Sequence, residues 1–175
     1  MKIRLWLLLL LIHTGVLYAQ DSLMADFPRQ WEGEWAGELE IFSGKGKVQT
    51  LPMKLLIRPD EKNEVWKWTI VYQTDTPDVR EYELIVSDRE KGHFIIDEKN
   101  SILLDGWLLG NVLSCRFSVG KSLLLVNYAF ERDFIRFDIF AGNKSEPRLT
   151  GAEVEDVGEI YNYPVTTMQR AVLRR

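Results

Sequence analysis

Short segments in which apolar and polar residues alternate follow one another along most of the chain, and this period of two constrains the fold most. In the first segment, Trp35, Leu39 and Ile41 fall on one face and three glutamates fall on the other. Eight further segments of this kind follow up to position 141, and a tenth is predicted at 165–173. Short turns, of which Gly110-Asn111 is the clearest hairpin signal, make successive strands antiparallel neighbours. Because closure removes exposed strand edges, the pattern predicts an all-β chain folded as an antiparallel up-and-down β-barrel of eight to ten strands.

The first residues have the pattern of a secretory signal peptide. Lys2 and Arg4 precede an uncharged apolar run at 5–12, and Ala19 is a small residue suited to a cleavage site. The run is too short to span a bilayer comfortably. We therefore expect a signal peptide at 1–19 and an exported, periplasmic or secreted protein without a stable membrane anchor. Residues 20–175 are expected to form a single β-barrel domain that starts with a short N-terminal lead-in helix.

Composition and charge argue against several classes of function. The chain of 175 residues carries a net charge of −4 and has no basic stripe, which argues against nucleic acid as a partner. Cys115 is its one cysteine, and His93 is the one histidine after the predicted signal peptide. An intramolecular disulfide and a zinc site of the usual composition therefore cannot be assembled. The sequence has no motif for a nucleophile or a phosphate loop, so we expect no catalytic residues, no metal, no cofactor and no enzymatic activity.

At Gly33-Glu-Trp35 the sequence resembles the calycin superfamily, which includes lipocalins and fatty-acid-binding proteins. In that family a Gly-x-Trp lies on the first strand, ahead of a meander of eight or ten strands, and a basic residue of the last strand packs over the Trp. The resemblance implies that Gly33, Trp35 and Arg170 close one end of the barrel, with Arg174 as the second candidate for the arginine. A haem-binding branch shares the Gly-x-Trp-x-Gly pattern but binds iron through a late histidine. No histidine follows His93, so haem is not expected.

The inward positions of the predicted barrel are unusually aromatic. The candidate ligand-binding residues are Trp66, Trp68, Tyr82, Phe117, Tyr128 and Phe137, the last with the pair Phe134 and Phe140 as the alternative. These rings either line a cavity or simply fill the core. A cavity, which the resemblance also implies, predicts non-catalytic binding of a small hydrophobic molecule. The alternative is a structural or interaction protein of the cell envelope, with a filled barrel and no small-molecule ligand.

The direction of several charged side chains stays open at this stage. Arg136 and Arg116 either face the interior, where they could bind a carboxylate, or lie outside, which the alternation favours. Asp105 lies in an apolar run and is either buried or placed at a bulge facing solvent, and no motif supports a Ser-His-Asp arrangement with His93. The loop at 142–159 suits a lid, a partner contact or a spacer.

Overall fold

The structure of the protein, a computed structural model, describes residues 26–62, 64–153 and 158–175. The predicted signal peptide at 1–19 and residues 20–25 of the predicted lead-in lie outside the described residues. No helix in the described part of the chain is long and apolar enough to cross a membrane.

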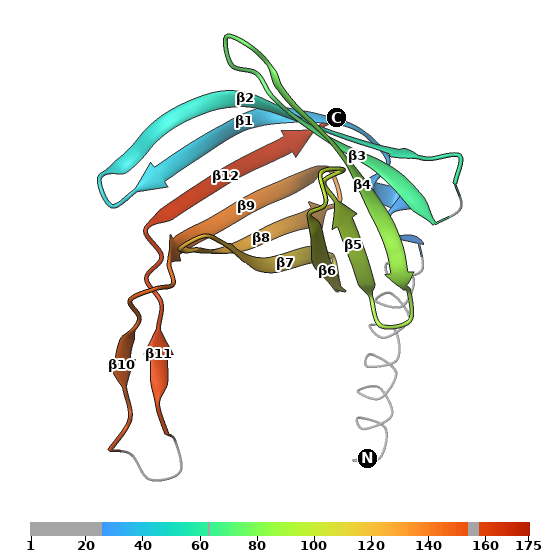
Figure 1. Cartoon of the computed structure of the whole chain (residues 1–175). Coiled ribbons are helices and arrows are strands. Elements are labelled where there is room, and N and C mark those ends of the chain that lie inside the picture. Colours follow the sequence, from blue (N-terminus) through green and yellow to red (C-terminus); the bar gives the residue numbers. More distant parts are fainter. Residues whose placement is uncertain (1–25, 63, 154–157) are drawn as a thin grey trace, which may run out of the picture.

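Ten strands close into one antiparallel barrel, in the order β1-β12-β9-β8-β7-β6-β5-β4-β3-β2 (Figure 1). The elements are η1 (Arg29–Trp31), β1 (Gly33–Ser43), β2 (Gly46–Pro59), β3 (Val65–Tyr72), β4 (Asp78–Asp88), β5 (His93–Asp97), β6 (Leu103–Leu109), β7 (Val112–Val119), β8 (Ser122–Glu131), β9 (Phe134–Asn143), β10 (Arg148–Thr150), β11 (Ile160–Asn162) and β12 (Thr167–Arg174). The predicted all-β class and up-and-down barrel are thus confirmed, at the upper end of the predicted strand number.

Alternation along each strand builds the core. On β2, Met53, Leu55 and Ile57 are completely buried, whereas the residues between them reach the outer face. Leu55 lies opposite Trp35 on one neighbouring strand and opposite Ile70 on the other, so inward side chains of three strands meet at one level. Any slip by one residue would move this apolar set to solvent, which is why the pattern determines the register so strongly.

Aromatic side chains close one end of the barrel. Phe27 meets Trp31 and Phe94 edge-on, with ring centroids 4.7 and 4.8 Å apart, and Trp31 stacks on Phe130 at 5.5 Å. Within the predicted lead-in segment the structure describes a 3-10 turn, η1, and its last residue, Trp31, is buried. This end is a packed plug, so any free interior space must lie toward the other end.

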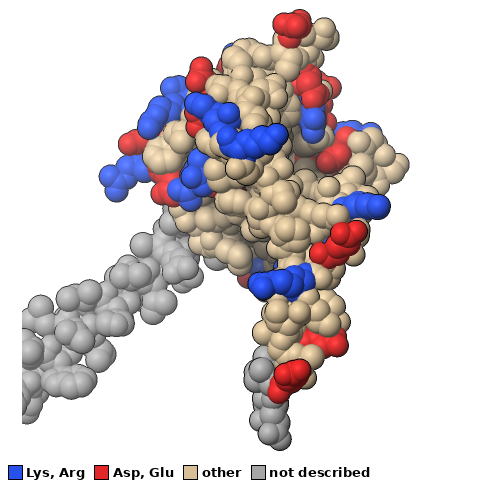
Figure 2. All heavy atoms as spheres, turned by 90° about the vertical axis from the view of Figure 1, so that its left-hand side faces the viewer, with Lys and Arg blue, Asp and Glu red and all other residues tan. Residues whose placement is uncertain are grey.

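The described residues of the predicted loop at 142–159 include regular structure. β9 continues to Asn143, and β10 and β11 then pair as a separate two-stranded hairpin that projects from the barrel (Figures 1 and 2). Each of its strands has three residues, which is too short for an alternating pattern to be recognised. Leu149 and Tyr161 lie opposite each other on this hairpin and are both about half exposed.

Candidate functional site

A cavity of about 390 Å³ occupies the half of the barrel away from η1 and opens to solvent. Its apolar lining consists of Ile70, Ile96, Leu104, Phe117, Val119, Leu124, Val126, Phe137 and Ile139. Its polar or weakly polar lining consists of Tyr72, Arg80, Tyr82, Glu98, Cys115, Ser122 and Tyr128. Alternation puts these side chains inside, because each lies at an inward position of β3 to β9 or just beyond a strand end.

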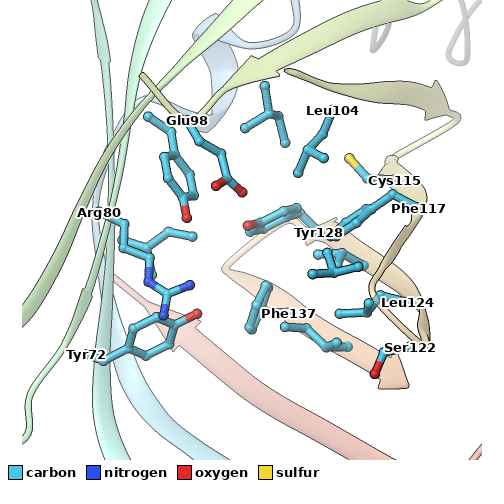
Figure 3. Close-up of a pocket in the computed structure, with 16 residues that line it drawn as sticks. Tyr72, Arg80, Glu98, Leu104, Cys115, Phe117, Ser122, Leu124, Tyr128 and Phe137 are labelled. Atoms are coloured by element: carbon cyan, nitrogen blue, oxygen red, sulfur yellow. The ribbon is translucent and has the colours of Figure 1, made fainter. Parts of the chain in front are cut away.

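The charged groups of the cavity lie on one wall. Figure 3 shows Tyr72, Arg80 and Glu98 on one side, facing Phe117 and Leu124 across the cavity. Arg80 donates from Nη2 and Nε to Asp78 Oδ2, at 2.9 and 3.2 Å, and its guanidinium lies 5.1 Å from the centre of the Tyr72 ring. The Arg80 and Asp78 side chains are each nearly half exposed, so this ion pair marks the mouth.

These contacts and burial raise the pKa values of Arg80 and Tyr72 on this wall. The hydrogen bond to Asp78 raises the pKa of the Arg80 guanidinium above its already high ordinary value. Burial raises the pKa of the Tyr72 hydroxyl to about 12, so Tyr72 is a neutral donor at any physiological pH. The wall therefore offers a permanent cation that Asp78 partly neutralises, the neutral Tyr72 hydroxyl and the carboxyl group of Glu98.

An aromatic column forms the floor of the cavity. Trp31 lies 6.2 Å from Trp68, which meets Tyr128 edge-on at 5.2 Å, and Tyr128 in turn lies 5.0 Å from Phe137. Tyr128 is buried, and this burial raises the pKa of its hydroxyl well above the ordinary value. The column runs from the closed end to the cavity, so a molecule in the cavity would rest on Tyr128 and Phe137.

The predicted ligand-binding residues divide between cavity and core. Tyr82, Phe117, Tyr128 and Phe137 line the cavity. Trp68 lies beneath it, packed against Tyr128 and completely buried.

Trp66 is buried near the closed end. It borders a separate hollow beside η1, together with Asp60 and Arg89, rather than the main cavity. Phe134 and Phe140, the alternative to Phe137, lie on the outer face of β9, since Phe137 and Ile139 point inward.

Sequence reasoning missed the polar part of the cavity. Tyr72, Arg80 and Glu98 were not among the candidates, although Arg80 stands two residues before the candidate Tyr82 and Tyr72 stands four after the candidate Trp68. Extending the alternation to the ends of β3 and β4 would have found both. Glu98 follows the last residue of β5, where the pattern alone gives no direction.

Arg175, not Arg170, packs over the tryptophan of the Gly-x-Trp motif. Its guanidinium lies 4.5 Å from the Trp35 ring centre and donates from Nη2 to the Glu32 carbonyl oxygen at 2.8 Å. The Trp35 indole donates to the Trp31 carbonyl oxygen at 2.8 Å, and Gly33 takes a positive φ of 142° beside Arg175. Gly33 and Trp35 thus lie at the closed end, and the arginine that packs there is Arg175.

The prediction for Arg170 is wrong because of strand parity. Ala171 and Leu173 point inward, so Arg170 and Arg174 must point outward. Arg170 donates to Asp138 at 2.6 Å on the outer surface, and Arg174 stacks on Phe134 at 5.0 Å.

Arg136 and Arg116 also lie outside the barrel, as the alternation favours. Arg136 donates from Nε to Asp138 Oδ2 at 3.1 Å. Together with Arg170 it covers Asp138, whose exposed fraction is 5 % although it faces outward. Arg116 is exposed, next to the inward Phe117. Neither arginine can therefore bind a molecule in the cavity.

His93 and Asp105 pair on the outer surface. The His93 Nε2 and Asp105 Oδ1 atoms are 2.8 Å apart, and the His93 ring stacks on Trp107 with centroids 4.6 Å apart. Asp105 is not at a bulge; it faces solvent because Leu104 and Gly106 take the inward positions of β6. Among the residues described, no hydroxyl hydrogen-bonds to His93, so the pair has no nucleophile beside it.

No protein-family model matches the sequence, and no curated protein matches it. A solved structure does match: the S-type phycobiliprotein lyase CPES from Guillardia theta. The two chains superpose with a TM-score of 0.60, over 89 % of this chain and 96 % of that one, at 6 % sequence identity. At this identity the likeness shows the fold alone, and with the ten-stranded barrel it confirms the calycin-like architecture.

The prediction that the protein is not an enzyme is contradicted by this finding. The prediction rested on missing catalytic motifs in a barrel typical of binding proteins, and the solved structure that shares the barrel belongs to a lyase. The architecture therefore gives no ground for excluding catalysis.

Proposed function

We propose that the protein binds a small molecule with an apolar or aromatic body inside the barrel. The open cavity of about 390 Å³ carries this proposal. Its size falls within the range of roughly 300–1,000 Å³ that is typical of small-molecule pockets, and such pockets combine apolar walls with a few polar groups. The alternative of a barrel filled by its own side chains is disfavoured, because the interior of this barrel retains that space.

The solved lyase structure supports the proposal only through the fold. That protein is a phycobiliprotein lyase, so a barrel of this architecture occurs in a lyase. The chemical class of the ligand therefore has to be inferred from the side chains that line the cavity of this protein.

Two adjacent residues of β9 allow a matched test. Ile139 lines the cavity, whereas Phe140 lies on the outer face. We expect the neutral fluorescent probe N-phenyl-1-naphthylamine to bind the wild-type protein and F140W with one site each. In I139W the added ring occupies the cavity, and we expect affinity to fall at least about tenfold. Equal affinity for all three proteins, or no binding to any, would refute the proposal, provided that urea unfolding shows the variants to be folded.

We further propose that the protein is exported, to the periplasm or the exterior. The charged start, the apolar run at 5–12 and Ala19 support this. Expression of the full chain in a bacterium should yield a periplasmic or secreted product whose intact mass lacks residues 1–19. The variant L8R, which places a charge in the apolar run, should keep the full-length mass and stay in the cytoplasm. A cytoplasmic, full-length wild-type product would contradict export.

A further inference from the structure

Glu98 is the one acid among the residues that line the cavity, and its side chain is directed into it. Glu98 directly follows β5, and because Glu83 pairs with Asp97, it comes to lie next to Tyr82 of β4. Figure 3 shows its carboxyl group pointing into the cavity, where the residue is half-buried. Its Oε2 atom accepts from the Asn100 amide at 3.4 Å, but no lysine or arginine in the described part of the chain forms a salt bridge with it.

The lysine that follows in the sequence pairs with other acids, on the outer surface. Lys99 Nζ lies 3.1 Å from Glu83 Oε2 and 4.0 Å from Asp97 Oδ2. These two acids stand next to the inward residues Tyr82 and Ile96, so alternation directs both outward. Lys99 thus neutralises acids outside the barrel and leaves the charge inside it without a counter-ion.

Arg80, the one cation among the lining residues, already has partners of its own. Its Nε and Nη2 atoms donate to Asp78, and its guanidinium lies 5.1 Å from the centre of the Tyr72 ring. The hydrogen bond to Asp78, together with one to Tyr82, raises the pKa of the guanidinium. An anionic group of a ligand would have to displace Asp78 from this arginine, and it would share the cavity with the like charge of Glu98.

The charge that remains to be matched in the cavity is therefore negative. Arg80 and Asp78 neutralise each other, whereas the Glu98 carboxylate has no cationic partner among the described residues. A carboxylate that is partly removed from water gains most from a cation that also donates a hydrogen bond, and an ammonium group carries three such donors. The net charge of −4 on the chain also favours the approach of cations over that of anions.

From this arrangement we infer that the ligand is an apolar amine, with a protonated alkylamine nitrogen that pairs with Glu98. The apolar body extends across the cavity to the opposite side, where Phe117 and Phe137 offer rings for it to pack on. A simple carboxylic acid, such as a fatty acid, is the class that this distribution of charge disfavours. The inference rests on the proposed function, because it names the chemical class that the same cavity selects.

Three naphthalene compounds with the same body separate the charge from the cavity itself. 1-(Aminomethyl)naphthalene, 1-naphthalenemethanol and 1-naphthaleneacetic acid are cationic, neutral and anionic at pH 7. Their inhibition constants are measured by displacement of the neutral probe N-phenyl-1-naphthylamine. In the wild type we expect the amine to bind about tenfold more tightly than the alcohol, and the acid to bind most weakly. This ranking tests the inference without any variant.

Two variants assign the preference to one residue. E98Q keeps the size of the side chain and removes its charge, so the amine should lose about tenfold in affinity while the alcohol is unchanged. E81Q removes the same charge from an exposed position outside the cavity lining, between Arg80 and Tyr82, and should leave all three compounds unaffected.

The other outcomes distinguish failure of the inference from failure of the proposed function. If the acid binds the wild type most tightly, or if E98Q leaves the affinity for the amine unchanged, the inference is wrong and the proposed function stands. If E98Q weakens the amine and the alcohol equally, the loss is one of shape and the inference is again wrong. If neither the fluorescent probe nor any of the three compounds binds the wild type, the proposed function itself fails.

Discussion

Arg174 and Arg175 are adjacent in the sequence but contact different parts of the barrel. Arg174 points outward and stacks on Phe134, whereas Arg175 lies over Trp35 and bonds to the Glu32 carbonyl group. The two side chains have the same chemistry, so strand parity alone separates a surface residue from one that closes the barrel. The strand face on which a residue lies must therefore be known before a motif can be used to assign its role.

Arg175→Ala should destabilise the fold by about 1–3 kcal/mol, because it removes a cation–π contact and a hydrogen bond to a backbone carbonyl group. Arg174→Ala is the matched control and should cost less than about 1 kcal/mol, since its contact lies on the surface. Urea unfolding followed by tryptophan fluorescence measures both. Equal losses in the two variants would show that Arg175 has no special part in closure.

Cys115 should be inert in the folded protein. It is 1 % exposed, and burial raises the pKa of its thiol to about 12, so almost no thiolate exists at pH 8. We expect no reaction with a disulfide reagent at pH 8 until denaturant is added. The double variant S114C/C115S moves the thiol to the outer face of β7 and should react while folded. Fast reaction of native Cys115 would show that the cavity admits the reagent to its wall.

At the scale of elements, two strands of the barrel approach each other unusually closely, and a second pair of strands lies outside the barrel. A Cβ atom at Gly37 would lie 2.3 Å from the Val172 carbonyl oxygen, so β1 and β12 pack in a way that only glycine permits. By contrast, β10 and β11 pair only with each other, outside the closed ladder. The barrel is closed by ten other strands, so its closure does not depend on the pairing of β10 with β11.

Gly37→Ala should therefore destabilise the protein by about 1–3 kcal/mol, through displacement of β12 from β1. Gly44, in the turn after β1, has open space at its Cβ position, and Gly44→Ala should change stability by less than about 0.5 kcal/mol. Chemical unfolding of the two variants tests this contrast. A neutral Gly37→Ala would mean that the two strands can separate at little cost.

At the scale of the whole molecule, the barrel is divided into a packed half and a hollow half. Phe27, Trp31 and Trp35 fill the closed end, whereas neutral Tyr72, Tyr128 and Cys115 surround the hollow. These three lining residues are weak acids, and burial disfavours their ionised forms.

Stability should accordingly fall in alkali. Below about pH 8 these three groups are protonated in both the folded and the unfolded state, so their contribution to stability is complete. As pH rises from about 8 toward 12 the unfolded chain releases these protons first, and Tyr72 and Cys115 then each cost on the order of 1–3 kcal/mol of stability by pH 11, with Tyr128 acting in the same direction. Urea midpoints measured between pH 8 and 11 should decline, and the decline should be smaller in Y72F. Exchange of the exposed Tyr163 for Phe is the control and should leave the decline unchanged; a flat wild-type profile would contradict the argument.

The ten strands could be predicted from the sequence because alternation is a local property. Each strand carries its own inward and outward sets, as Met53, Leu55 and Ile57 do on β2, and short turns force antiparallel order. Four of the six predicted ligand-binding residues line the cavity for the same reason.

Only the tertiary structure decided which inward residues surround free space and which fill the core. Trp68 and Tyr128 obey the same alternation, yet Trp68 lies under the floor and Tyr128 forms it. Likewise, Arg80 pairs with Asp78 at the mouth because of its position along the barrel axis. Arg175, and not Arg170, packs on Trp35 because β12 closes the barrel against β1. Alternation along one strand determines the direction of a side chain, but its depth in the barrel and the residues it meets depend on strands distant in sequence.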